Sequence, residues 1–148
     1  ISHELSDHPP ATYLWDQDLR DFFAHTDNGH VMVGNVHADD LAEIQKEIVS
    51  DCNVPEEQFR KINIFAFICL EGGNPEGRVK DTTTRRIVNR VFYSDGESAH
   101  KLVYTDADGF TSAAPRDAES EAKCRAFLEE SLEGSERTLE GVRELFLS

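Results

Sequence analysis

Apolar residues recur at helical spacing in several stretches of the chain, with acidic side chains between them. This 3.6-residue period predicts amphipathic helices. Asp40, followed three residues later by Glu43, forms a capping-box pattern and predicts that one helix begins at Leu41. Pro55 stands close to the start of a further short helix. The predicted helices cover about residues 15–23, 41–52, 117–132 and 136–147, and a short helical start is predicted at residues 53–57.

Strands are predicted where β-branched and aromatic residues lie between turn-forming residues. Ile62–Leu70 is the most apolar stretch, with apolar residues on both faces, so we expect a central strand that is covered on both sides. Asp95-Gly96 is typical of a hairpin turn between two strands. The other predicted strands are His30–Val36, Arg86–Tyr93, His100–Thr105 and a short one at Phe110–Ala113.

The elements follow one another in the order helix-strand-helix-strand-strand-strand-helix-helix. This order predicts an α+β fold: a single-layer, mixed and mostly antiparallel sheet of about 4–5 strands with helices packed on it. The first strand–helix–strand unit could be a parallel crossover. Residues 1–148 are expected to form a single domain, in which 1–13 is an irregular lead-in.

Composition places the chain among globular proteins. It has 148 residues, of which 39% are hydrophobic and nine are Phe, enough for a core that needs no disulfide. Its three cysteines include no Cys-x-x-Cys pair, and Cys69 lies within the apolar run, where a buried thiol is expected. This cysteine usage favours a cytoplasmic location. No apolar run is long enough to cross a bilayer, so no membrane association is expected.

Charge is distributed unevenly around a formal net value of −14. Residues 1–60 carry 13 acidic and 3 basic side chains, and residues 117–148 carry 9 acidic and 4 basic ones. Residues 61–116 are close to neutral, with 7 acidic and 8 basic side chains. Because the net charge repels phosphate backbones, direct nucleic-acid binding is not expected.

Basic residues cluster in the near-neutral region. If Arg86–Tyr93 alternates regularly, Arg86, Val88, Arg90 and Phe92 share the outer face, and Ile87, Asn89, Val91 and Tyr93 face the core. Arginine beside apolar side chains is typical of a binding surface. The alternative is that these cations protect an exposed sheet edge or balance acidic helices. The predicted partner- or anion-binding residues are Arg78, Lys80, Arg85, Arg86, Arg90 and Phe92.

Catalytic and metal-binding motifs give weaker signals. Five of the six histidines lie in the first 37 residues, and His25, His30 and His37 are weak metal candidates. Their spacing does not place two imidazoles on one helix face, so no metal site and no cofactor is expected. The glycines between 72 and 77 lack the Lys-Ser/Thr pair of a phosphate-binding loop, and no catalytic residue is predicted.

Three functional hypotheses are compatible with these patterns. The missing catalytic motifs and the segregated charge favour a non-enzymatic acidic binding or regulatory domain: an adaptor, chaperone, inhibitor or immunity-type protein. Such a domain would bind a protein partner or a second copy of itself. The alternatives are a small-ligand or metal-binding enzyme that uses the N-terminal histidines, and a nucleic-acid mimic that presents its carboxylates.

Overall fold

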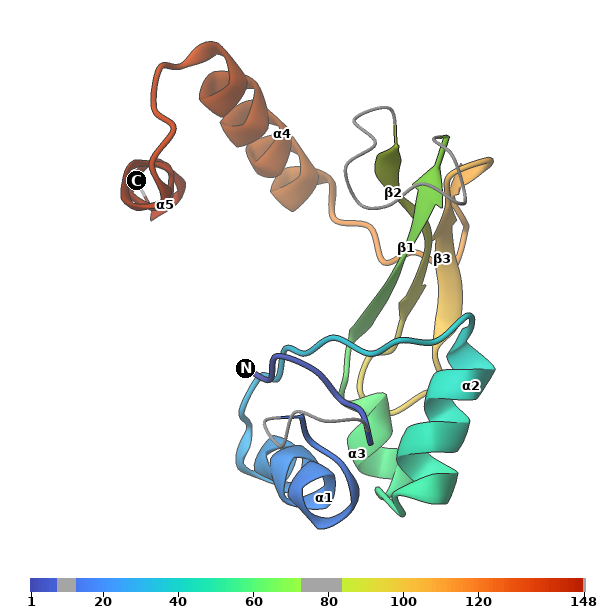
Figure 1. The fold of residues 1–148 in the computed structure, drawn as a ribbon. Helices are drawn as coiled ribbons and strands as arrows, with labels where there is room; N and C mark the ends of the chain where they lie inside the picture. Colours follow the sequence, from blue (N-terminus) through green and yellow to red (C-terminus); the bar gives the residue numbers. More distant parts are fainter. Residues whose placement is uncertain (8–12, 73–83, 148) are drawn as a thin grey trace. The chain divides into compact units, whose positions relative to one another are not determined.

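The structure is a computed structural model that describes residues 1–7, 13–72 and 84–147 (Figure 1). The chain forms two compact units, Ile1–Ala114 and Pro115–Ser148, and each is described by itself below. The single-domain organisation expected from the sequence stays a prediction. The described parts contain no helix with the length and apolarity needed to cross a membrane.

The first unit begins with helices at the predicted places. Helix α1 covers Asp16–Ala24 and passes into a 3-10 turn. Helix α2 begins at Leu41 and runs to Gln45, after which a π-helical turn, η2, covers Lys46–Asp51. The capping pattern is confirmed, because the Asp40 carboxylate accepts a hydrogen bond from the Glu43 amide at 2.9 Å. Helix α3 covers Glu56–Arg60, directly after Pro55.

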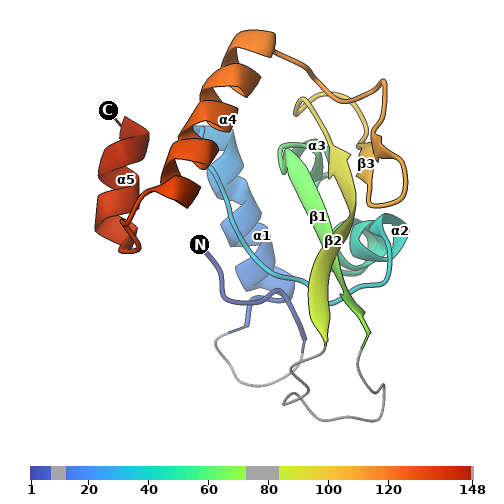
Figure 2. The same cartoon turned by 90° about the horizontal axis from the view of Figure 1, so that it is seen from above.

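The sheet of this unit has four described strands: β1 Ile64–Glu71, β2 Arg85–Tyr93, β3 Lys101–Thr105 and β4 Gly109–Phe110. They pair in the order β1-β2-β3-β4, and every pair is antiparallel. This confirms the α+β class with its mostly antiparallel sheet. Figure 2 shows β1 and β2 running side by side along their length.

The predicted strand His30–Val36 is not a strand of the described sheet, and within it only Val36 forms an isolated bridge, to Leu5. His30–Val36 does not pair with β1, because its backbone is engaged by the N-terminal segment instead: the Ser2 amide donates to the Val33 carbonyl and the Leu5 amide to the Asn35 carbonyl, both at 2.8 Å. β1 is therefore the edge strand of the described sheet, and not the central strand that its apolar sequence predicts. The sequence does not specify which extended segment pairs with a given edge of β1, because segments of similar composition can occupy the same place.

The hydrophobic core lies among α1, η2, α3 and the inner face of β1, which we define as the face that carries Phe65 and Phe67. Helices α1, α2 and α3 of this unit gather at one end of the sheet (Figure 1). Cys52 is fully buried in this core, as its place in the apolar stripe predicts, whereas Cys69 is half-buried. The buried cluster consists of Leu5, Leu19, Phe23, Ile44, Ile48, Cys52, Val54 and Phe59.

The second unit is a pair of helices, α4 at Ala118–Glu133 and α5 at Leu139–Leu147. The Asp117 carboxylate caps α4 by accepting hydrogen bonds from the Glu119 amide and the Ser120 hydroxyl. The rings of Phe127 and Phe146 meet edge to face with centroids 5.3 Å apart. None of the unit's described residues is buried. Apolar packing between α4 and α5 therefore consists of partly exposed contacts such as this one.

Candidate functional site

A β-bulge decides where the clustered arginines lie. Phe67 pairs with Arg90 but Ile68 pairs with Val88, so Asn89 is an extra residue in β2. The alternation of faces reverses at this point. Arg86 and Val88 consequently share one face of the sheet, whereas Arg90 and Phe92 share the other. The predicted common face for these four residues was wrong, because regular alternation cannot anticipate an inserted residue.

Arg90 is engaged within the fold. Its Nη2 donates a hydrogen bond to the Asp39 carbonyl oxygen at 2.7 Å, across 51 residues of sequence. Its guanidinium carbon lies 5.0 Å from the centroid of the Phe67 ring, within the range of a cation–π interaction. Phe92 contacts the same ring edge to face, at 5.7 Å. Arg90 therefore ties β2 to the segment that leads into α2.

The other predicted cations have different surroundings. Arg85 forms an exposed ion pair with Glu71, its cross-strand neighbour. The Arg86 side chain is exposed and makes no hydrogen bond or ion pair with any residue in the described ranges. Arg78 and Lys80 lie outside the described residues. Of the six predicted residues, Arg86 thus combines exposure with the lack of a described partner.

Apolar side chains surround Arg86 on the outer face of β1 and β2. Leu70 is its cross-strand partner, and Ile68 pairs with Val88 one step further along. An antiparallel sheet with one solvated face normally presents polar residues there, so this pattern is unusual. We call Ile64, Ile68, Leu70, Arg86 and Val88 the outer sheet surface. Its four apolar members are exposed: Ile64 to 61%, Ile68 and Leu70 each to 65%, and Val88 to 40%.

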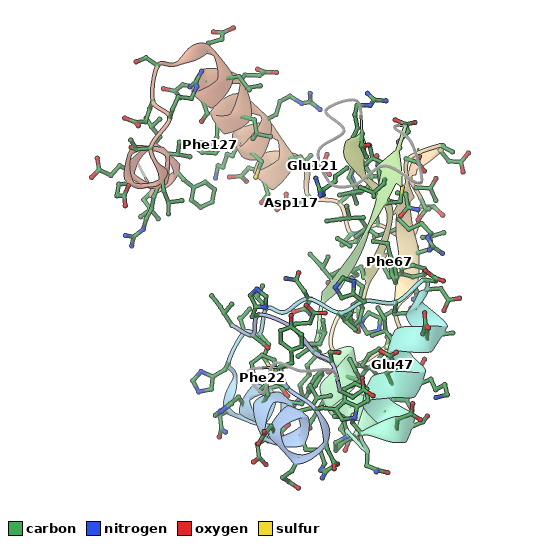
Figure 3. All side chains as sticks on the ribbon, in the orientation of Figure 1. Phe22, Glu47, Phe67, Asp117, Glu121 and Phe127 are labelled. Atoms are coloured by element: carbon green, nitrogen blue, oxygen red, sulfur yellow. The ribbon has the colours of Figure 1, made fainter. Side chains whose placement is uncertain are left out.

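A groove runs along the unpaired edge of β1. One wall is the segment Gly29–Ala38 and the other is Lys61–Ile68, at the unpaired edge of the sheet. Its volume is about 940 Å³, and core side chains from α1 and the α2–η2 helix form its floor. Phe22 from α1 and Phe67 from β1, both labelled in Figure 3, line it from different elements. We call this feature the edge groove.

The candidate metal-binding histidines do not converge. The rings of His25 and His30 touch edge to face, with centroids 5.6 Å apart. The Nε2 of His37 instead lies 3.0 Å from the Glu4 carboxylate. Within the described ranges, no group of three or more His, Cys, Asp or Glu side chains could hold a metal ion.

One histidine outside the predicted set, His100, is half-buried and packs beside the core. The Nε2 of His100 lies 2.7 Å from the Ile62 carbonyl oxygen, and its ring packs against Phe59 and Phe65 with centroids 5.1 Å and 4.9 Å away. Burial lowers the pKa of His100, although the carbonyl contact opposes this shift. A neutral imidazole at this position joins α3, β1 and β3, which is a structural role.

Comparison of the chain with family models, with curated proteins and with solved structures finds no match. The function is therefore argued from the outer sheet surface and the edge groove themselves.

Proposed function

We propose that this chain is a non-enzymatic, cytoplasmic binding domain that acts through protein–protein contacts made by the outer sheet surface. The observation that carries the proposal is an exposed arginine without a described partner, Arg86, set among Ile68, Leu70 and Val88. Arginine and large apolar residues are enriched at the energetic centres of interfaces. The three free thiols are compatible with a reducing compartment.

Charge defines what the partner must offer. The domain carries −14 overall, so a partner with an excess of basic groups is attracted at long range. At close range the partner must present an apolar patch, because the apolar side chains of Leu70 and Val88 are exposed to 65% and 40%. It must also place a carboxylate or a carbonyl oxygen opposite Arg86, since a guanidinium is costly to bury unpaired.

Affinity capture with the tagged full-length protein from its source cells tests the proposal. Arg86→Glu and Leu70→Glu should each reduce the recovery of the partner that the wild-type protein captures by about tenfold or more, as expected for residues at the centre of an interface. Arg143→Glu, an exposed residue of α5, makes the same change of charge as Arg86→Glu and should recover the partner normally.

Far-UV circular dichroism verifies that each variant is folded before its recovery is compared. Equal recovery by wild type and both outer-surface variants would contradict the proposal. Self-association is the other outcome that the sequence predicts, and sedimentation velocity detects it. In that case the wild-type dimer should dissociate in Arg86→Glu but persist in Arg143→Glu.

A further inference from the structure

We propose that the edge groove binds an extended peptide segment of a partner protein, which adds to the sheet as a strand beside β1. This goes beyond the proposed function, because it concerns the unpaired edge of β1, which shares only Ile64 and Ile68 with the outer sheet surface, and a different mode of recognition. In strand addition, main-chain hydrogen bonds supply affinity, and pockets for alternate side chains supply specificity. Three features of the groove carry the inference: its free backbone groups, its dimensions and its charge.

The β1 wall offers unpaired backbone groups. The Asn63 carbonyl accepts a hydrogen bond from the Ser94 amide at 2.9 Å, which places residue 63 in a hydrogen-bonded pair with β2. Residues of an antiparallel strand alternate between facing the partner strand and facing away from it. Ile64 and Ala66 therefore turn their N–H and C=O groups away from β2, towards the groove that both residues line.

The opposite wall is arranged in the same way. The carbonyls of Val33 and Asn35 are occupied by amides of the N-terminal segment. Because an extended chain alternates, the backbone groups of Gly34, which lies between them, point away from that segment and into the groove. No described hydrogen bond joins the two walls. A single added strand can thus bond to both walls.

The size of the groove matches one strand. The wall Ile62–Ile68 spans about 20 Å at the usual rise of about 3.3 Å per residue. A strand of that length occupies roughly 1,000 Å³, if strand spacing is about 4.8 Å and sheet thickness about 10 Å. The groove volume is about 940 Å³. It therefore accommodates a peptide of about six residues in extended conformation.

The surroundings define the side chains of this peptide. Apolar side chains that alternate along it would rest on groove-lining residues that are partly exposed, namely Phe22, Met32, Phe65 and Phe67. Of the charged side chains that line the groove, Glu4 and Asp95 are acidic and Lys61 is basic, in a domain whose residues 1–60 carry 13 acidic and 3 basic side chains. Lys61, at one end, is already paired with Asp27 at 2.6 Å. The positions between the apolar ones are therefore favoured as Lys or Arg.

A synthetic peptide tests the inference directly. The probe is a capped heptapeptide with valine and lysine in alternation, titrated into the full-length isotope-labelled protein and followed by amide NMR shifts. Saturable shifts should concentrate in residues 30–38 and 62–68. The same peptide N-methylated at alternate residues, which removes its hydrogen bonds to one wall, should bind at least tenfold more weakly. A glutamate-for-lysine version should also be weaker, because of the acidic surroundings.

The protein variant Ala66→Pro removes an outward N–H of the edge strand, a place where proline is tolerated. It should weaken peptide binding tenfold or more, while Arg86→Glu should leave it unchanged. The two surfaces are thereby tested separately, since Arg86→Glu affects only the outer sheet surface. Absence of binding at about 1 mM peptide, equal binding of the N-methylated peptide, or shifts that lie elsewhere would overturn the inference.

Discussion

Arg86 and Arg90 provide a matched pair of arginines whose replacement should have very different effects on stability. They lie four residues apart in β2, but the bulge at Asn89 places them on opposite faces. Methionine retains much of the apolar length of arginine and removes its charge and its donors. We expect Arg90→Met to destabilise the protein clearly and Arg86→Met to leave its stability almost unchanged.

The expected magnitude follows from the contacts of Arg90. A hydrogen bond from a charged group contributes about 1.5–3 kcal/mol, and the lower end applies because the bond to Asp39 is solvent-accessible. The cation–π contact with Phe67 adds about 0.5 kcal/mol at such a site. Arg90→Met should therefore lower the free energy of unfolding by about 2 kcal/mol. Arg86, which has no described partner, should change it by less than about 0.5 kcal/mol.

Equilibrium unfolding in urea, followed by circular dichroism, measures both effects. With a slope of about 2 kcal/mol/M, the Arg90→Met midpoint should fall by about 1 M and the Arg86→Met midpoint by less than about 0.3 M. Arg90→Lys should be intermediate, because a lysine keeps the charge but not the planar donor group. Equal midpoints for Arg86→Met and Arg90→Met would contradict the bulge and would indicate that the two arginines lie on the same face of the sheet.

Three further predictions concern stability. Burial, and then the nearby Glu43 and Asp51 carboxylates, raise the pKa of Glu47, which is labelled in Figure 3. In thermal melts, Glu47→Gln should therefore stabilise the fold by about 0.5 kcal/mol at pH 7, and this gain should become progressively smaller below about pH 5. Burial lowers the pKa of His100 below the ordinary histidine value of about 6.5. The folded protein should therefore lose stability as the pH falls below that value, and His100→Gln should show a weaker loss in urea titrations at pH 7 and 5.5. Phe59→Ala should cost about 3–5 kcal/mol in the same assay, because the ring is buried against Phe65 and His100.

Features that depend on neighbouring residues could be predicted from the sequence. The Asp40 cap forms because the carboxylate and the Glu43 amide are three residues apart in any helix that starts there. The turn after β2 forms at Asp95-Gly96, where Gly96 has a φ of 93° and the Asp95 carboxylate accepts from the amides of Glu97 and Ser98. The order of helices and strands rests on such local patterns, and the α+β class follows from it.

Features that depend on distant residues could not be predicted. The bulge adds one residue to β2 opposite the Phe67–Ile68 step, and nothing in the local sequence marks Asn89 as the extra one. The faces were also hard to assign because Ile87 and Val88 are both apolar, so either could face the core. The hydrogen bond from Arg90 to Asp39 spans 51 residues, and only the folded chain reveals that this cation is already used.

β1 links these differences between sequence and structure to the two proposed binding surfaces. A strand with apolar residues on both faces was expected to be central, but in the described sheet it has an unpaired edge and an exposed outer face. Such an edge invites uncontrolled pairing with other chains, and proteins usually protect it with charge or proline. Ile64–Leu70 contains neither. Here the segment Gly29–Ala38 lines the groove opposite this edge, and the groove volume of about 940 Å³ is close to that of one strand. If a partner peptide fills the groove, as we propose, the apolar sequence of β1 is that of a strand whose cover is supplied by a partner.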